Sequence, residues 1–336
     1  MNQQPDQSAY PINIPQQKPP IKLSRVRLHV GIGAFAVALV FLLSSLAQII
    51  IHSIVLNVAP EVAENDWYMW VMSGVPMYAF AMPLSYLLLR TVPADRPKKQ
   101  KLHPLMWAGF LCLCFALSFI ANYLGQYVSA WFSNLTGIQI ENELEQMTVN
   151  TPFFINLLFV GILAPVFEEL FFRKAVIDRL RRYGDLPAIL ISGLAFGLIH
   201  GNLSQVFYAT AVGMLLSFLY VRTGSVLYTI SIHAAFNMIG GVYTTEILRR
   251  TGESLTPAEG DVLGWVMLAS YSLFTVVALV IGVVFLLVNV RSFARSLKKG
   301  DYTLTFDQWM NVITLNPGVW MFVLMILLLF LSSFLS

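Results

Sequence analysis

Charged residues are scarce in this 336-residue chain: they make up 12% of it, whereas apolar residues make up 57%. A water-soluble domain carries roughly 25% charged residues, so this sequence has too little polar surface to cover a soluble fold. The net charge of +3 is small and gives no reason to expect a nucleic-acid partner. The low content of charged residues and the high content of apolar ones favour an all-α protein that spans a lipid bilayer.

Cysteine is nearly absent as well. The chain has only Cys112 and Cys114, and a spacing of one residue suits neither a zinc knuckle nor a redox motif. Both cysteines lie in an apolar run, so we interpret them as small apolar residues of a helix. No cleavable secretory signal is recognisable, because the first 26 residues are polar and rich in Pro and Gln. We expect residues 1–26 to form a disordered cytoplasmic tail.

Long apolar segments fill most of the remaining sequence, and about 20 such residues make one membrane span. They lie at 28–57, 67–89, 104–130, 152–178, 186–200, 203–221, 225–247, 262–290 and 317–336. The fifth is short for a complete crossing. The sequence therefore predicts a polytopic transmembrane helical bundle with about nine spans.

The distribution of charge supports this count, since cytoplasmic loops are enriched in Lys and Arg. If the N-terminus is inside and the segments alternate, every basic residue except Arg249 and Arg250 falls on the inner side. The outer loops carry acids instead: Glu61, Glu64, Asp66, Glu141, Glu143, Glu145, Glu246, Glu253, Glu259 and Asp261. We therefore expect a multi-pass plasma-membrane protein with a cytoplasmic N-terminus and an extracytoplasmic C-terminus.

A few polar residues lie inside predicted spans, where ionisable groups are costly and usually functional. Glu169 and Arg173 are four residues apart, the favoured spacing for a helical ion pair. Glu168 has no basic residue three or four positions away. Desolvation disfavours such a lone charge, so Glu168 is the better candidate for taking up a proton.

Two histidines and an asparagine complete the group. His233 and Asn237 are four residues apart and share a helix face. Glu168 lies about 15 residues before the predicted turn at Tyr183-Gly184, and His200 about 16 after it, so both reach a similar depth at 1.5 Å per residue. The sequence predicts one pocket that contains a carboxylate, two imidazoles and an amide.

These residues resemble the three motifs of a known family. Glu168-Glu169-x-x-x-Arg173, Phe196-x-x-x-His200 and His233-x-x-x-Asn237 are similar to the signature of the CPBP intramembrane proteases. This is the CAAX prenyl endopeptidase and bacteriocin-processing family, also called Abi. The resemblance covers 152–247, which would be the catalytic core, with N-terminal membrane segments at 27–151 and C-terminal ones at 248–336. It also implies a core of eight helices, outside which the ninth predicted span would lie.

The resemblance implies hydrolysis of peptide bonds within the membrane. Glu168 and His200 would activate the attacking water, His233 and Asn237 would form the oxyanion hole, and Glu169 with Arg173 would support the site. The expected substrate is a membrane-associated peptide or protein tail, of the CAAX type or the bacteriocin-processing and self-immunity type. The oligomeric state stays open.

Metal dependence also stays open, because the family is often grouped with metallopeptidases. Glu168, His200 and His233 would be the ligands of a divalent metal such as zinc, but the same side chains suffice without one. The sequence has no His-Glu-x-x-His motif, which favours a metal-independent mechanism.

Other functions compete with proteolysis. Tyr183-Gly184-Asp185 lacks the first glycine of an aspartyl intramembrane protease motif, and Leu190 replaces the glycine that a serine-type motif needs before Ser192-Gly193. A transporter with a Glu/His proton relay is a further alternative, although no paired, interrupted halves are recognisable. A non-catalytic immunity or scaffold protein with the same fold is another.

Overall fold

The computed structural model describes residues 21–335 except 66, 138–147, 150 and 253–259, and these described residues contain helices and no strands. The N-terminal part consists of α1 (Leu23–Val58), η1 (Pro60–Val62), α2 (Tyr68–Gly74), η2 (Val75–Ala81), α3 (Met82–Leu89) and α4 (Pro104–Thr136). The central part begins with α6 (Phe153–Asn156), η3 (Leu157–Leu163), α7 (Ala164–Glu168), η4 (Glu169–Ile177), α8 (Asp178–Leu180) and η5 (Arg181–Tyr183). It continues with α9 (Asp185–Leu198), α10 (Leu203–Thr223), α11 (Val226–Asn237), η6 (Met238–Val242) and α12 (Tyr243–Thr251). The C-terminal helices are α13 (Val262–Ser296), α14 (Phe306–Thr314) and α15 (Pro317–Leu335).

The predicted helical bundle is confirmed, and each predicted apolar segment coincides with helix. Seven helices in the described part of the chain are long and apolar enough to cross a membrane, and the pair α14–α15, bent by 68°, gives an eighth. The expected number of about nine is too high because α9 has only 14 residues. Such a helix is about 21 Å long, which is shorter than the hydrocarbon core of about 30 Å.

The predicted tail was too long by four residues, because α1 already begins at Leu23. Residues 1–20 of that tail lie outside the described residues. So do several of the predicted outer acids, namely Asp66, Glu141, Glu143, Glu145, Glu253 and Glu259.

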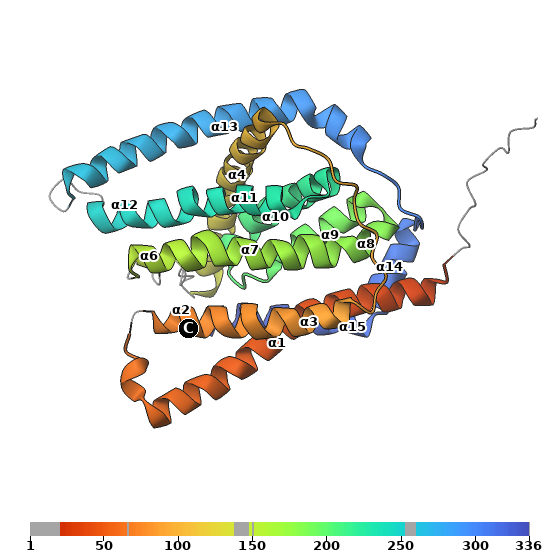
Figure 1. Cartoon of the computed structure of the whole chain (residues 1–336), viewed down its shortest axis with the longest axis horizontal. Helices are drawn as coiled ribbons and strands as arrows, with labels where there is room; N and C mark the ends of the chain where they lie inside the picture. Colours follow the sequence, from red (N-terminus) through yellow and green to blue (C-terminus); the bar gives the residue numbers. More distant parts are fainter. Residues whose placement is uncertain (1–20, 66, 138–147, 150, 253–259, 336) are drawn as a thin grey trace, which may run out of the picture.

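The basic loops meet at one end of the bundle, which lies to the right in Figure 1. The amide of Gln100 donates to the carbonyl of Thr223 at 2.7 Å, and the amide of Tyr302 donates to that of Arg182 at 3.2 Å. The side chain of Asn316 bonds to the carbonyl of Arg27 at 2.8 Å. Loops that the charge pattern assigned to one side therefore lie together. That this side is cytoplasmic stays a prediction.

The helices run mostly lengthwise in Figure 1, with α1 and α15 at one edge and α13 at the other. Between these edges, α9 packs on α10, and α4 packs on both α10 and α13. Many large apolar side chains stay exposed on the outer helices, including Leu287 at 69% and Val288 at 75%. Such exposure suits a surface that contacts lipid.

Four segments are wound as π-helices: η2, η3, η4 and η6. Prolines accompany two of them, since Pro76 lies in η2 and Pro165 follows η3. Proline has no backbone N–H and disturbs the regular helical bonding. π-helical segments are frequent at functional sites, and these four contribute to or adjoin the cavity described next.

Candidate active site

His200 lies at a break in the backbone between α9 and α10. Gly201 adopts a positive φ of 63°, and Asn202 caps α10 by accepting from the amide of Ser204 at 2.8 Å. Because α9 has only 14 residues and is too short to cross a membrane, we expect this irregular segment to lie at membrane depth. Non-helical backbone is tolerated there only when protein covers it or it lines a cavity. Gly201 and Asn202 are buried, and His200 faces a cavity.

The position of His200 depends on close packing of α9 against α10. A Cβ atom on Gly197 would overlap the Thr210 hydroxyl and lie 2.7 Å from the Thr210 backbone nitrogen. One turn earlier, a Cβ on Gly193 would lie 2.7 Å from the backbone nitrogen of Met214. This small-xxx-small pair lets the two backbones approach closely, as in other membrane helix pairs.

We expect Gly197→Ala to reduce thermal stability in detergent and to lower, more than tenfold, the rate of any reaction that depends on His200. The added methyl group must push α9 away from α10, and overpacking costs about 1–3 kcal/mol. A misplacement of about 1 Å in a catalytic group lowers rates by about 10²-fold, and His200 is only three residues away. Gly33→Ala is the matched control, because nothing lies within 4 Å of a Cβ added there. Equal rates and melting temperatures for the two variants would disprove this role for Gly197.

A buried ionic chain connects η4 to α11. Glu169 and Arg173 are both fully buried, and Arg173 Nε lies 3.0 Å from Glu169 Oε2. The other carboxylate oxygen of Glu169 lies 3.0 Å from His233 Nδ1. The predicted Glu169–Arg173 pair is thus confirmed. Since a carboxylate can only accept, Nδ1 of His233 carries the proton of this bond, and the second ring nitrogen faces Glu168.

Arg173 also packs on the aromatic ring of Phe196, with the guanidinium carbon 4.5 Å from the ring centroid. Its contact with Glu169 is an ion pair, because none of its nitrogens has a hydrogen-bond partner among the described residues. The rings of His200 and His233 meet the same phenyl ring edge-on, at 5.2 and 5.7 Å between centroids. Both imidazoles and the arginine therefore pack against the same phenyl ring of Phe196.

Asn237 donates a hydrogen bond from Nδ2 to the carbonyl of Val160 at 2.9 Å. In the register of η3, the amide of Ala164 bonds to the carbonyl of Phe159, five residues earlier. Pro165 would be the next donor, to Val160, but it has no N–H. The proline thus leaves a carbonyl that Asn237 satisfies, and this bond fixes the amide on α11 against η3. The second N–H of Asn237 stays available.

Glu168 lies at the end of α7, with 15% of its side chain exposed, and its Oε2 is 3.9 Å from His233 Nε2. Among the described residues, Glu168 forms no ion pair with a Lys or Arg. His200 directs Nδ1 to the carbonyl of Phe196 at 2.8 Å. A carbonyl only accepts, so Nδ1 carries a proton, and Nε2 of a neutral ring keeps its lone pair.

One cavity of about 510 Å³ brings the predicted residues together. Glu168, His200, His233 and Asn237 all line it, and Trp70, Tyr78, Gln205 and Tyr208 contribute further polar atoms. Glu169 and Arg173 do not line it and lie behind His233. Ligand sites commonly have volumes of about 300–1,000 Å³ and combine apolar walls with a few convergent polar groups. This cavity fits that description.

Tyr78 belongs to this site, although the sequence interpretation missed it. Its ring stacks on Phe167 with centroids 5.0 Å apart and planes 7° apart, next to Glu168 in the chain. The available signal was a tyrosine between Pro76 and Pro83 in the second span. Tyr208 was missed as well, because no motif or spacing distinguishes it from a packing residue of α10.

The possible metal ligands do not form a metal site in this arrangement. No group of three or more His, Cys, Asp or Glu side chains in the described part of the chain is placed to hold an ion. The residues present therefore do not fit a zinc ion as they stand, and the mechanism below uses none.

Comparison with known proteins agrees with the motifs. The sequence profile described as type II CAAX prenyl endopeptidase Rce1-like matches residues 150–239, which contain all three motifs. The protein named "Putative membrane peptidase YdiL" from Bacillus subtilis (strain 168) is 29% identical over 172 residues. This alignment covers 48% of the present chain and 67% of that protein. No solved structure matches the chain. Together with the three motifs, the profile match and this relative support assigning the chain to the CPBP family of intramembrane proteases.

Proposed function

We propose that this protein is an endopeptidase that hydrolyses peptide bonds of membrane-associated peptides or protein tails with a water molecule activated by Glu168 and His200. One observation carries the proposal: a carboxylate without a basic partner on its helix and the free nitrogen of a fixed imidazole line the same cavity. A buried cavity with a proton acceptor and converging donors is the arrangement that peptide hydrolysis requires.

In the proposed reaction, Glu168 removes a proton from water while Nε2 of His200 orients that water. The water oxygen forms a bond to the carbonyl carbon, and the carbonyl oxygen becomes negatively charged. The intermediate collapses when the carbon–nitrogen bond breaks, and Glu168 returns its proton to the leaving nitrogen. The products are a carboxylate and a protonated amine, because the second proton of the water passes from the new carboxyl group to the amine. A general base of this kind contributes roughly 10²–10⁴-fold.

His233 and Asn237 are the proposed donors to the oxyanion. Glu169 holds the His233 ring through Nδ1 at 3.0 Å, so a protonated ring presents its Nε2–H toward the cavity. Asn237 uses one amide hydrogen for Val160 and has a second one left for the substrate. Each oxyanion donor stabilises the transition state by roughly 3 kcal/mol. Glu169 and Arg173 are positioning residues, because they act through His233.

The substrate class follows from the site's location. The cavity adjoins the mid-membrane break at His200, so we infer that the cleaved bond belongs to a segment that enters the bilayer. CAAX-type tails and bacteriocin-type peptides both have this property. Full-length protein in liposomes, offered matched peptides with and without a prenylated cysteine, distinguishes the two. The basic end of the bundle would face the cytoplasm of a cell whose plasma membrane contains the protein.

The direct test is cleavage of membrane-anchored peptides by the purified full chain in liposomes, with His200→Ala as the comparison. We expect wild-type cleavage, detected by mass spectrometry, and a much smaller rate for a His200→Ala variant that elutes as folded protein. Absence of cleavage together with proton flux that depends on Glu168 would favour the transporter. Full biological activity of a cleavage-deficient variant would favour the scaffold.

A metal chelator should leave the rate unchanged. The described residues offer no metal-holding cluster. The measurement is the cleavage rate after prolonged incubation with a strong zinc chelator and its removal. A rate that falls and returns on adding Zn²⁺ would show that the side chains rearrange around a metal, and would replace the mechanism above.

A further inference from the structure

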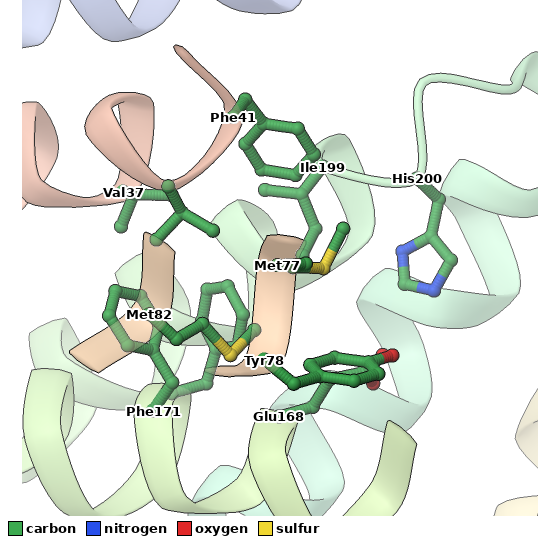
Figure 2. A pocket seen from close by; sticks show the side chains of 11 residues that line it. Val37, Phe41, Met77, Tyr78, Met82, Glu168, Phe171, Ile199 and His200 are labelled. Atoms are coloured by element: carbon green, nitrogen blue, oxygen red, sulfur yellow. The ribbon is translucent and has the colours of Figure 1, made fainter. Parts of the chain in front are cut away.

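A second, smaller cavity of about 180 Å³ lies on the other side of the catalytic groups. It shares Met77, Tyr78, Glu168 and His200 with the larger cavity. These four side chains thus form a wall between the two spaces. Figure 2 shows Val37, Met82 and Phe171 on one side of the small cavity and His200 on the other, with Tyr78 and Glu168 between them.

Apart from this shared wall, the small cavity is lined by apolar side chains. They come from α1, α3, η4 and the end of α9: Val37, Val40, Phe41, Met82, Phe171, Phe172 and Ile199. Val37, Val40 and Met82 are 3%, 2% and 5% exposed, so protein covers this side of the space, which is not fully enclosed. The polar atoms of the lining belong to the shared wall, so the rest of the space offers few of the two to four polar partners that a bound water needs. The small cavity therefore suits an apolar group.

The size of the cavity limits what it can hold. An engineered cavity of about 150 Å³ lined by Leu, Ile and Phe binds benzene. A space of about 180 Å³ thus accommodates one branched aliphatic or aromatic side chain. The two methionines in its lining add adaptability, because the thioether chain is flexible and polarisable.

The position of the small cavity limits which side chain of a substrate can enter it. A scissile carbonyl attacked by water at Glu168 and His200 must lie at the shared wall. The two α-carbons that flank a peptide bond are about 3.8 Å apart, so only the side chains of the flanking residues begin close enough to enter. We propose that the small cavity is the specificity pocket of the enzyme and binds an apolar side chain, of the size of Leu or Phe, next to the cleaved bond. This inference rests on the proposed function.

The test uses membrane-anchored peptides in which each residue flanking the cleaved bond is Ala, Leu or Phe. Full-length protein in liposomes cleaves them in competition, and mass spectrometry gives the ratios of kcat/KM. One methylene group in an apolar pocket changes such ratios by about 10–200-fold. We therefore expect Leu or Phe at one flanking position to exceed Ala by at least about tenfold.

Val37→Phe places a ring in the small cavity from α1, which carries none of the motif residues. We expect it to lower the Leu-to-Ala ratio at least tenfold. Val37→Ala enlarges the same space and should raise the Phe-to-Leu ratio of kcat/KM. This variant provides a second test if Val37→Phe fails to fold. Val58→Phe is the matched control, because Val58 lies on the same helix with 78% of its surface exposed and should leave every ratio unchanged.

The results separate the two claims. If wild-type protein cleaves peptides in a His200-dependent manner but both Val37 variants leave the ratios unchanged, the specificity pocket is wrong and the peptidase stands. If wild-type protein prefers Ala at both positions, the specificity pocket is again wrong. If no peptide is cleaved, or His200→Ala cleaves as well as wild type, the proposed function fails and the pocket assignment with it.

Discussion

Glu168→Gln should lower the peptidase rate by at least about 10²-fold while the protein stays folded. Glutamine has nearly the shape of glutamate but cannot accept the proton of the attacking water, and a general base contributes roughly 10²–10⁴-fold. Glu168 forms no ion pair with a Lys or Arg among the described residues, and the 3.9 Å to His233 Nε2 is its charged contact there. Removing its charge should therefore cost little stability. The measurement is the cleavage rate in liposomes beside the melting temperature in detergent.

Glu246→Gln is the matched control for this experiment. Glu246 pairs with Arg249 at 2.7 Å and with Arg250 at 2.6 Å on α12, away from the cavity lining. Its replacement should leave the cleavage rate within about twofold, since surface ion pairs contribute little. A Glu168→Gln protein that retains most of the wild-type rate would remove Glu168 from the reaction.

Arg173→Met should destabilise the protein strongly. Arg173 and Glu169 are both 0% exposed, and removing one partner of a buried pair costs about 3–5 kcal/mol because the other charge stays uncompensated. Methionine keeps the length and apolar stem of the side chain and can still pack on Phe196. We expect a clear fall in the detergent melting temperature and, because Glu169 holds His233, a lower cleavage rate.

The double variant Glu169→Gln/Arg173→Met tests whether the uncompensated charge of Glu169 causes the loss of stability in Arg173→Met. It removes both charges, and neutral replacement of a buried pair is often tolerated. The glutamine oxygen can still accept from Nδ1 of His233, so we expect recovery of most of the stability and part of the rate. Arg250→Met is the control, because that side chain is partly exposed and its loss should shift the melting temperature far less. No recovery in the double variant would show that the ionic chain itself is required.

The sequence predicted much of the site because helical periodicity and depth constrain a membrane protein strongly. The spacing of four between Glu169 and Arg173 correctly predicted their ion pair. The turn at Tyr183-Gly184 correctly placed Glu168 and His200 at a common depth, since both line one cavity. The positive loops correctly marked one end of the bundle.

Other features could not be predicted from the sequence because they depend on tertiary packing. Tyr78 reaches the cavity through the π-helical segment η2, and no periodicity of 3.6 predicts a change of helical register. Asn237 was expected to serve the oxyanion hole, and its bond to the Val160 carbonyl that Pro165 leaves without a donor was not foreseen. The short α9 was counted among the spans because hydropathy does not show that a break at membrane depth is covered by neighbouring helices.

The two cavities could not be anticipated either. Their shared wall combines Met77 and Tyr78 with Glu168 and His200, from segments separated by up to just over a third of the chain. Of these four residues, only Glu168 and His200 could be recognised from the sequence as candidate site residues, because ionisable side chains are unusual in a membrane span. A role for an apolar residue such as Val37 can be inferred only when the cavity that it lines is known.

Cleavage of one membrane-anchored peptide in ¹⁸O-labelled water shows whether the attacking oxygen comes from water. We expect wild-type protein in liposomes, freed of metal by chelation, to release a fragment whose new carboxyl group contains one heavy oxygen, and Glu168→Gln to release almost none. An unlabelled fragment, or equal amounts of labelled fragment from both proteins, would contradict hydrolysis by a Glu168-activated water.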